Sequence, residues 1–224
     1  MKNINLRCDK GQCIAMIGPN GCGKTTLIKS ILGMVVPDAG SIIFNGENIK
    51  NKHQYRNQIG YMPQIGRYPD NMTIGHIINM IRDMRGETEK TDEDLLHAFD
   101  LPSLYEKRMR TLSGGTTQKV SATLAFLFNP DVLILDEPTA GLDPLATEIL
   151  KEKIITEKEK GKLIFITSHQ LSELDDLVTE VIFMQDGNIR FHKAVNDLLQ
   201  STGEQKIAKA IANILKNEIS EQNS

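Results

Sequence analysis

The stretch that decides the fold of this chain is Gly18-Pro19-Asn20-Gly21-Cys22-Gly23-Lys24-Thr25. It follows the pattern G-x-x-x-x-G-K-[ST], which forms a phosphate-binding loop where a strand precedes it and a helix follows it. Both neighbours are predicted here, because residues 14–17 are an apolar run and residues 26–32 carry apolar side chains at helical spacing before Gly33. The sequence therefore predicts an α/β fold that binds a nucleoside triphosphate.

The residue types of this glycine loop match the chemistry of phosphate binding. Glycines let successive backbone N–H groups point at phosphate oxygens, and the helix N-terminus adds a partial positive charge. We expect Lys24 to reach the outer phosphates and the Thr25 hydroxyl to bind Mg²⁺. The predicted nucleotide-binding residues of the loop are Asn20, Gly21, Cys22, Gly23, Lys24, Thr25 and Thr26.

A second apolar run, residues 132–135, ends in two acids, Asp136 and Glu137. A continuous apolar run is typical of a parallel strand that is buried on both faces. A buried carboxylate is costly unless it is paired, and Mg²⁺ with its waters would meet that need for Asp136. Glu137 points elsewhere and is a candidate to orient or deprotonate the water that attacks the γ-phosphate. The alternative is that both acids only cap the next turn.

The run Leu112-Ser113-Gly114-Gly115-Thr116, followed by Gln118-Lys119, narrows the class further. Alone, Ser113 is an ordinary helix N-cap. Together with the glycine loop, however, the run resembles the signature of the ATP-binding cassette family. Other motifs of that family also occur along the chain in the order that the family has. They are a glutamine loop at Gln64, a D-loop over residues 141–144 and a switch histidine at His169. Singly, Gln64 could be a surface amide and His169 a core imidazole.

The resemblance implies an α/β fold with a P-loop NTPase core, a mostly parallel sheet, an antiparallel β edge and an inserted helical subdomain. Residues 1–66 and 111–192 are then expected to form the nucleotide-binding core, which is RecA-like. Residues 67–110 are expected to form the helical subdomain, since Ile74, Ile77, Ile78 and Ile81 share a helical face. Residues 193–224 are expected to form a C-terminal helical tail.

The resemblance also implies ATP and Mg²⁺ as cofactors and a head-to-tail homodimer. In that arrangement Ser113, Gly114 and Gly115 of one copy face the γ-phosphate held by the other copy. His169 and Glu137 would be catalytic, and Asp143 would lie at the seam of the dimer. Gln64 would be both catalytic and a Mg²⁺ ligand, beside Thr25 and Asp136.

The function implied is that of an ATP-hydrolysing subunit that energises a separate transmembrane permease. The sequences of residues 59–69 and 112–128 resemble those of exporter ATPases, most closely the ATPases of the copper-site maturation system of nitrous-oxide reductase. A docking surface for the permease is predicted at residues 65–70, with Tyr68 as an aromatic anchor and Arg67 as a polar clamp. The alternative for Tyr68 is packing under its own loop. The alternative for the whole chain is an ATP-binding cassette ATPase that acts on another macromolecular complex.

Composition is consistent with that interpretation. The chain has 224 residues and a formal net charge of −3, which does not favour a nucleic-acid partner. It has no apolar run of the roughly 20 residues that span a bilayer, and residues 1–17 do not resemble a signal peptide. We therefore expect a cytoplasmic location at the inner face of the cell membrane, with contact to the membrane only through the permease.

Three further features complete the predictions. None of the 17 residues before Gly18 is aromatic, whereas the family usually stacks adenine on an aromatic side chain there. Either the chain starts at an internal methionine of a longer protein, or another surface holds the base. Asn45-Gly46 after the apolar residues 42–44 predicts a hairpin, which we expect to form the antiparallel edge. In the tail, the apolar face of residues 207–215 favours a packing helix over a docking helix.

Overall fold

The computed structural model describes residues 1–86 and 90–222, so that parts of the predicted segments 67–110 and 193–224 lie outside the described residues. The strands are β1 (Cys13–Ile17), β2 (Ile43–Phe44), β3 (Glu47–Asn48), β4 (Ile59–Met62), β5 (Val132–Asp136), β6 (Leu163–Thr167), β7 (Glu180–Gln185) and β8 (Asn188–Ala194). The helices are α1 (Lys24–Ile31), α2 (Ile74–Arg85), α3 (Asp94–Ala98), α4 (Gly114–Phe126), α5 (Pro144–Glu159), α6 (Val195–Thr202) and α7 (Ile207–Gln222).

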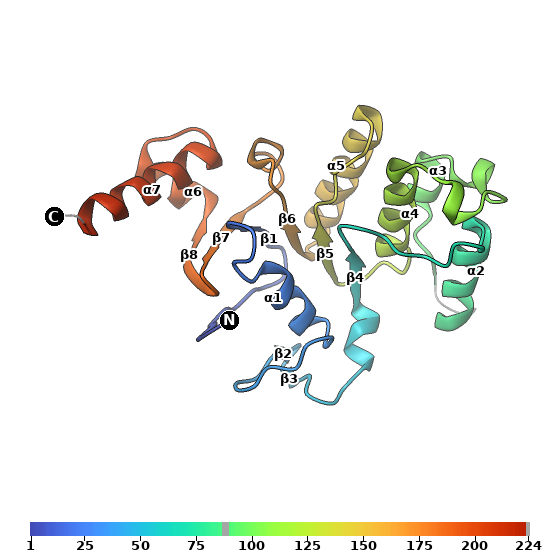
Figure 1. The fold of residues 1–224 in the computed structure, drawn as a ribbon, viewed down its shortest axis with the longest axis horizontal. Helices are drawn as coiled ribbons and strands as arrows, with labels where there is room; N and C mark the ends of the chain where they lie inside the picture. Colours follow the sequence, from blue (N-terminus) through green and yellow to red (C-terminus); the bar gives the residue numbers. More distant parts are fainter. Residues whose placement is uncertain (87–89, 223–224) are drawn as a thin grey trace.

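The centre of the molecule is a six-stranded sheet with the order β4-β5-β6-β1-β7-β8 (Figure 1). The first five strands in that order are parallel, and β8 pairs antiparallel with β7. The predicted α/β fold with a mostly parallel sheet and an antiparallel edge is therefore confirmed. Parallel neighbours require crossovers, and helices supply them here.

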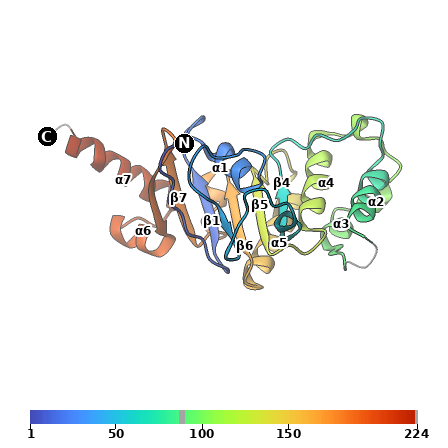
Figure 2. The same ribbon diagram turned by 90° about the horizontal axis from the view of Figure 1, so that it is seen from below.

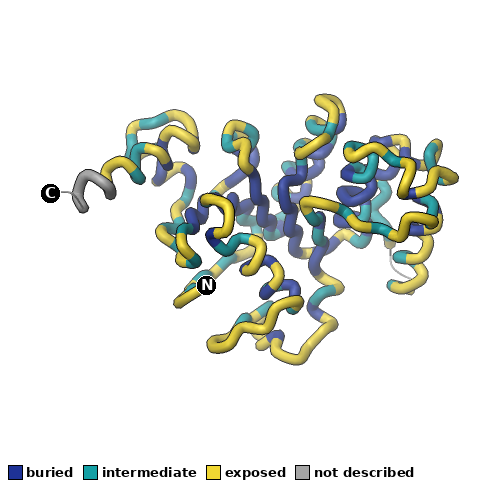
Figure 3. Tube along the Cα trace, viewed as in Figure 1, coloured by how far each residue is buried: buried dark blue, intermediate teal, exposed yellow. Residues whose placement is uncertain are grey.

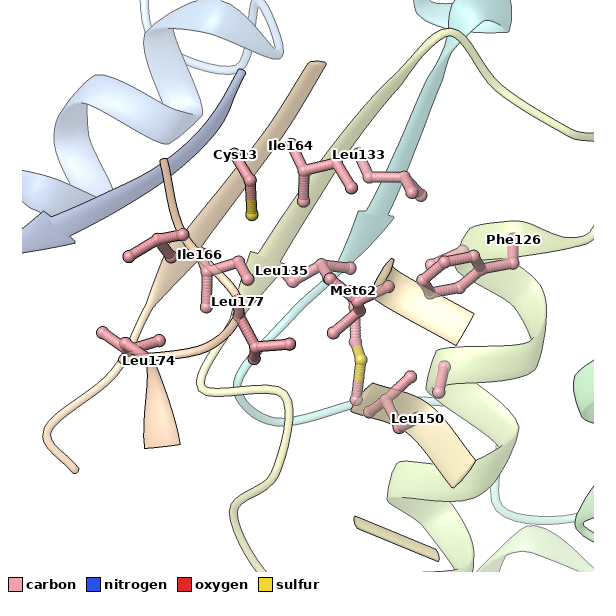
Figure 4. Close-up of a cluster of buried hydrophobic side chains, with 14 of the residues drawn as sticks. Cys13, Met62, Phe126, Leu133, Leu135, Leu150, Ile164, Ile166, Leu174 and Leu177 are labelled. Carbon is pink, nitrogen blue, oxygen red and sulfur yellow. The ribbon is translucent and has the colours of Figure 1, made fainter. Parts of the chain in front are cut away.

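The strands are buried on both faces, which explains their continuous apolar runs. In β1, Ile14 and Met16 join one core cluster with α1, while Cys13, Ala15 and Ile17 join a second cluster on the other face. Figure 4 shows the second cluster, where side chains of β4, β5 and β6 meet Phe126 of α4 and Leu150 of α5. The buried trace in Figure 3 follows these strands and the helices beside them.

A helical segment lies at one end of the sheet, between β4 and β5 in the chain (Figure 2). The expected apolar face of α2 is confirmed in part, because Ile74, Ile77 and Ile78 are buried while Ile81 is half-buried. Thr73 caps this helix by accepting a hydrogen bond from the His76 N–H at 3.2 Å. The exact division of the chain at residues 67 and 110 remains a prediction.

The predicted hairpin forms, but it is not the antiparallel edge of the main sheet. β2 and β3 pair only with each other, as a separate two-stranded sheet. Asn45 and Gly46 both have positive φ, 49° and 82°, as a tight hairpin turn requires. The edge that we expected from this hairpin is supplied instead by β8, because the β7–β8 turn at Asp186-Gly187 brings β8 back beside β7.

The tail helices lie at the opposite end of the sheet from α2 and α3 in both views (Figures 1 and 2). β8 runs to Ala194, so the sheet extends slightly past the expected start of the tail at residue 193. Ile207 and Ile211 are buried, and the Ile207 N–H donates to Asp175 Oδ1 at 3.0 Å. The described part of α7 is thus a packing helix. No helix among residues 1–86 and 90–222 has the length and apolarity to cross a membrane.

Candidate functional site

The register of the parallel strands gathers the predicted site residues at one edge of the sheet. Met16 of β1 and Asp136 of β5 both lie opposite Thr167 of β6, and Met62 of β4 lies opposite Leu135. The glycine loop, Glu137, His169 and Gln64 each follow one of these strand ends within two residues. Ligands of open α/β sheets bind at the carboxyl ends of the strands. The edge is therefore the candidate nucleotide site.

The glycine loop lies between the end of β1 and the start of α1. Gly18 has a φ of 153°, and a Cβ there would lie 2.1 Å from the Met184 carbonyl oxygen, so only glycine fits. The first backbone hydrogen bond of α1 is donated by Leu27 N to Gly23 O at 2.9 Å. The N–H groups of Lys24, Thr25 and Thr26 precede that bond and have no intrahelical acceptor. Three donors at a helix N-terminus fit a phosphate group.

Lys24 lies folded across its own loop. Its ammonium donates to the Gly18 carbonyl oxygen at 2.7 Å and the Pro19 carbonyl oxygen at 3.3 Å. It also lies 3.7 Å from the buried sulfur of Cys22. The side chains of Asn20, Thr25 and Thr26 are exposed beside it. The loop thus presents a cation, two hydroxyls and helix N–H groups, which fit the phosphates of a nucleotide and a Thr25-bound Mg²⁺.

Asp136 is buried and is held by the neighbouring strand. The Thr167 hydroxyl donates to Asp136 Oδ1 at 2.5 Å and accepts from the Glu137 N–H at 3.1 Å. Desolvation together with the charge of Asp136 raises the pKa of the Tyr61 phenol nearby, with burial the larger cause. A buried carboxylate with one oxygen hydrogen-bonded retains acceptor capacity on the other oxygen. That donor set fits a Mg²⁺ ion or its water.

Glu137 contacts His169 directly. Its Oε2 accepts from the His169 backbone N–H at 3.2 Å, and its Oε1 lies 3.4 Å from the imidazole Nε2. Glu137 also has a φ of 53°, a left-handed conformation that is uncommon for residues other than glycine. Gln118 of α4 donates to the Glu137 carbonyl oxygen at 3.3 Å. The surrounding contacts therefore hold the two predicted catalytic side chains together in a strained backbone turn.

Gln64 follows β4 at the same edge and is exposed. Within residues 1–86 and 90–222, its side-chain amide makes no hydrogen bond to another protein group. Two residues before it, β4 ends at Met62, whose side chain is buried in the core. The backbone of Gln64 is thus placed at the site, while its role as catalytic group and Mg²⁺ ligand remains a prediction.

The signature residues lie elsewhere on the chain. Ser113 caps α4, because its hydroxyl accepts from the Thr116 N–H at 3.2 Å. In both ribbon views the start of α4 is well separated from α1 (Figures 1 and 2). Among residues 1–86 and 90–222, no recorded hydrogen bond joins Ser113, Gly114 or Gly115 to the glycine loop. A single chain therefore keeps these two predicted phosphate-binding regions apart.

Asp143 and the D-loop lie beside the signature turn in the same chain. Asp143 caps α5, with its Oδ1 accepting from the Ala146 N–H at 2.9 Å. Its Oδ2 accepts from the Lys119 ammonium of α4 at 2.7 Å. The hydrogen bond from Lys119, helped by that from the Ala146 N–H, lowers the pKa of the Asp143 carboxyl. Asp143 is thus an anion held at a helix N-terminus, where the dipole favours it.

Sequence reasoning missed three residues that hold the site. Thr167 bonds both acids, Gln118 bonds Glu137, and Lys119 bonds Asp143. Each of them is adjacent to a predicted motif, but their partners are distant in sequence. The register of β5 against β6 and the docking of α4 decide these contacts, and neither is visible in a local pattern.

For Tyr68 the structure favours packing over docking, and its role as an aromatic anchor for a permease stays a prediction. Its ring is half-buried against the core, and its hydroxyl lies 2.9 Å from the Ser121 hydroxyl of α4. Burial raises the pKa of the Tyr68 phenol, although the Ser121 hydrogen bond acts in the opposite direction. Arg67 is exposed, and Ile65 exposes 69% of its surface. In this loop the exposed apolar side chain is therefore that of Ile65, whereas Tyr68 is half-buried.

Comparisons with known proteins agree with this geometry. Residues 1–140 match the family model described as ABC transporter. The chain is 33% identical to the Nod factor export ATP-binding protein I of Ralstonia nicotianae over 189 residues, which are 82% of this chain but only 59% of that relative. It is 33% identical to the lantibiotic transport ATP-binding protein SrtF of Streptococcus pyogenes, covering 86% of this chain and 83% of the relative. It is 34% identical to the molybdate/tungstate import ATP-binding protein WtpC of Methanocaldococcus jannaschii, covering 93% and 70%.

Solved structures support the same conclusion. An ATP-binding subunit of an ABC transporter superimposes with a TM-score of 0.84 at 28% identity, covering 92% of this chain and 89% of that one. A dimeric ATP-binding cassette in a post-hydrolysis state with ADP and Pi shares the fold, with a TM-score of 0.76 at 20% identity over 87% of this chain and 90% of that one. The family match covers more than half of the chain, and two of the relatives are covered over more than two thirds of their length. The chain therefore belongs to the ABC transporter family and is an ABC-type ATPase domain.

Proposed function

We propose that this chain is the ATP-binding and ATP-hydrolysing subunit of an ABC transporter and that it energises a separate transmembrane permease. The observation that carries the proposal is the Glu137–His169 contact, with Oε1 and Nε2 3.4 Å apart, at the sheet edge that also bears the glycine loop. A carboxylate and an imidazole beside a phosphate-binding loop are the groups that water activation and γ-phosphate contact require.

In this proposal the glycine loop binds the phosphates of ATP. The N–H groups of Lys24, Thr25 and Thr26 donate to phosphate oxygens, and the Lys24 ammonium exchanges its carbonyl partners for the outer phosphates. Thr25, Asp136 and Gln64 would hold Mg²⁺, which when bound neutralises charge on the phosphate oxygens. Thr167 positions Asp136 for that task through the hydroxyl hydrogen bond.

Glu137 is proposed to accept a proton from the attacking water or to orient it. Its carboxylate is only slightly exposed and already accepts one hydrogen bond from the His169 N–H, so it is held in place. His169 exposes about half of its side chain and can turn toward the γ-phosphate when nucleotide is bound. The strained backbone at Glu137 fits a side chain that must be aimed precisely.

The proposed active unit is a head-to-tail homodimer. The signature turn at Ser113 and the glycine loop are far apart in one chain, and each is a group of donors at a helix N-terminus. Two copies that face each other would place Ser113, Gly114 and Gly115 of one against the phosphates on the other. ATP would then join the copies, and hydrolysis would release them. The ATP-binding cassette of the same fold with ADP and Pi is dimeric, which supports the pairing of two copies.

The proposed partner is a permease that docks at the loop after β4. Ile65 and Arg67 are exposed there, directly after Gln64, so a change at the nucleotide site can reach them. This partnership would place the chain at the inner face of the cell membrane. We favour export, as in the Nod factor and lantibiotic relatives, although one relative is an import protein. These relatives give no support to a link with copper-site maturation.

ATP hydrolysis by the purified chain is the first test of the proposal. Phosphate release should need Mg²⁺, and the specific activity should rise with protein concentration, because the site is completed by a second copy. Lys24→Ala should lower ATP affinity, since it removes the cation of the loop. Absence of turnover at every concentration, with ATP still bound, would overturn the proposed activity.

The permease partnership is tested in membranes. When the chain is recovered from cross-linked membranes, a polytopic membrane protein should co-purify with it in fixed stoichiometry. The Ile65→Asp variant should no longer bind that membrane protein, but it should retain basal ATPase activity. Recovery with ribosomes or another soluble assembly instead would favour the second candidate, a non-transport ATPase of the same family.

A further inference from the structure

The ammonium of Lys119 lies where three parts of the chain meet. Lys119 belongs to α4, two turns after the signature residues begin. Its Nζ donates to Asp143 Oδ2 of the D-loop at 2.7 Å, and it lies 5.9 Å from the ring centroid of Phe99, which follows α3. A lysine at that distance from an aromatic face is attracted to it. One side chain thus connects the signature helix, the D-loop and the helical segment.

The backbones of the signature turn and the D-loop also touch. A Cβ on Gly115 would lie 2.7 Å from the Gly141 carbonyl oxygen, so a side chain at this position would push the two segments apart. The contact is independent of Lys119, since it involves only main chain on both sides. Together, the glycine contact and the Lys119–Asp143 bond place the signature turn and the D-loop against each other at two points.

We propose that Lys119 is a positioning residue for ATP hydrolysis: it holds the D-loop, residues 141–143, against the start of α4, so that both reach the nucleotide of a partner copy as one rigid unit. The inference rests on the proposed head-to-tail dimer. It assigns Lys119 no contact with ATP, because the ammonium is already engaged by Asp143 and Phe99.

Two features of the pair support a positioning role over a stabilising one. Asp143 is 52% exposed and Lys119 is 24% exposed, so water screens the pair and it adds little to folding. The two oxygens of Asp143 are divided between its partners, with Oδ1 on the Ala146 N–H and Oδ2 on Lys119. Removing Lys119 therefore keeps the cap of α5, while it releases the D-loop from α4 and loses the contact with the Phe99 ring.

The test is Lys119→Met, compared with Lys119→Arg and with a matched control, Lys151→Met. Lys151 is also 24% exposed and pairs with an exposed acid, Glu148, at 3.3 Å, but that pair lies within α5. Lys119→Met should lower kcat about five- to tenfold with an unchanged KM for ATP and an unchanged unfolding midpoint. Lys119→Arg should restore most of the rate, and Lys151→Met should match the wild type.

A double-mutant cycle with Asp143→Asn makes the test specific. Asparagine keeps the N-cap of α5 but loses the charge that binds Lys119. If the bond acts as proposed, the double variant is no slower than the slower single variant. Additive losses, or a Lys119→Met enzyme as fast as the wild type, would overturn the inference while leaving the proposed function standing. A wild type that does not hydrolyse ATP would overturn both, so the two failures are distinguishable.

Discussion

Helix α5 makes ionic contacts toward both of its ends, and the two differ sharply in burial. At its N-terminus, Asp143 and Lys119 form a pair with 52% and 24% of their side chains exposed. In its C-terminal half, Glu157 is fully buried and Lys153 is 5% exposed. Glu157 is paired with Lys153, Lys160 and Lys162, while Lys153 also pairs with Asp92 and Asp94 before and in α3. The same kind of interaction thus occurs in two different environments.

This difference in burial distinguishes ionic contacts that stabilise the fold from ionic contacts that position groups for ATP hydrolysis. A buried charge that loses its partner is costly, so breaking the Glu157 cluster should lower the stability of the fold. An exposed pair costs little to break and can shift during a reaction cycle. We therefore expect variants near the N-terminal end of α5 to change turnover, and variants of the Glu157 cluster to change stability.

The largest expected effect is at the site. Glu137→Gln should lower ATP turnover by at least about 100-fold, because the amide keeps the shape of the side chain but cannot accept the proton of water. ATP affinity and the unfolding midpoint should remain near those of the wild type. Phosphate release, nucleotide binding and thermal unfolding measured on one preparation check all three. Turnover near the wild-type rate would remove Glu137 from the mechanism.

At the buried end of α5, Glu157→Gln should reduce the free energy of unfolding by about 3 kcal/mol, because it removes the carboxylate paired with the buried Lys162 ammonium, whereas Lys153 keeps Asp92 and Asp94. Turnover per folded molecule should stay nearly constant. Urea denaturation provides the measurement, and Glu159→Gln is the matched control, since Glu159 is an exposed acid of the same helix. A stability loss no larger for Glu157→Gln than for the control would contradict the comparison.

Acid should act on the same buried end. Burial alone would raise the pKa of Glu157, but hydrogen bonds from Lys160 and Lys162 dominate together and lower it from 4.5 to about 2. Because the pKa of Glu157 is lower in the folded chain, its ionised carboxylate stabilises the fold at pH values above the pKa of the unfolded chain. That stabilisation is lost as the pH falls from about 4.5 to about 2. The unfolding free energy of Glu157→Gln should depend less on pH in that window, whereas that of the control Lys151→Met should follow the wild type.

The smallest expected effect concerns the loop that joins the site to α4. Tyr68→Phe removes the hydroxyl that meets Ser121 at 2.9 Å, and it should cost about 1 kcal/mol of unfolding free energy. Basal ATPase should hardly change, because neither hydroxyl is among the groups proposed to bind the phosphates, Mg²⁺ or the attacking water. Ser121→Ala serves as the partner variant, and the double variant should lose little more than either single one. Fully additive losses would mean that the two hydroxyls are not coupled.

Local sequence patterns predicted those parts of the structure that are determined by residues adjacent in the sequence. The strand–glycine loop–helix unit at residues 14–32 and the two acids at the end of β5 depend on short runs of neighbouring residues, and the structure has them. The hairpin at Asn45-Gly46 was predictable as a turn, but its separation from the main sheet depends on pairing with distant strands. Periodicity likewise does not report a buried Glu157. Its counter-charges Lys153, Lys160 and Lys162 are close in sequence, but its burial depends on how α5 packs against distant parts of the chain.

The same limit applies to the candidate site. The hydrogen bond from Gln118 to the Glu137 carbonyl oxygen forms only once α4 docks against the end of β5. The site residues themselves could be named from the sequence, whereas the groups that position them could not. Tyr68 shows the same limit, because a turn-rich loop suggests a docking anchor, whereas the half-buried ring and the hydroxyl contact with Ser121 of α4 depend on how the helix packs.

The central claim is that each nucleotide site is built from the glycine loop of one copy and the signature turn of another. Lys24→Ala damages the first part and Ser113→Arg the second, so either protein alone should be inactive. A mixed dimer of the two contains one intact site, formed by the unmutated loop of one chain and the unmutated turn of the other. ATP hydrolysis should therefore reappear on mixing, at up to about a quarter of the wild-type rate if the copies pair at random and the two sites act independently. Mixed dimers that demonstrably form and yet hydrolyse no ATP would contradict the account.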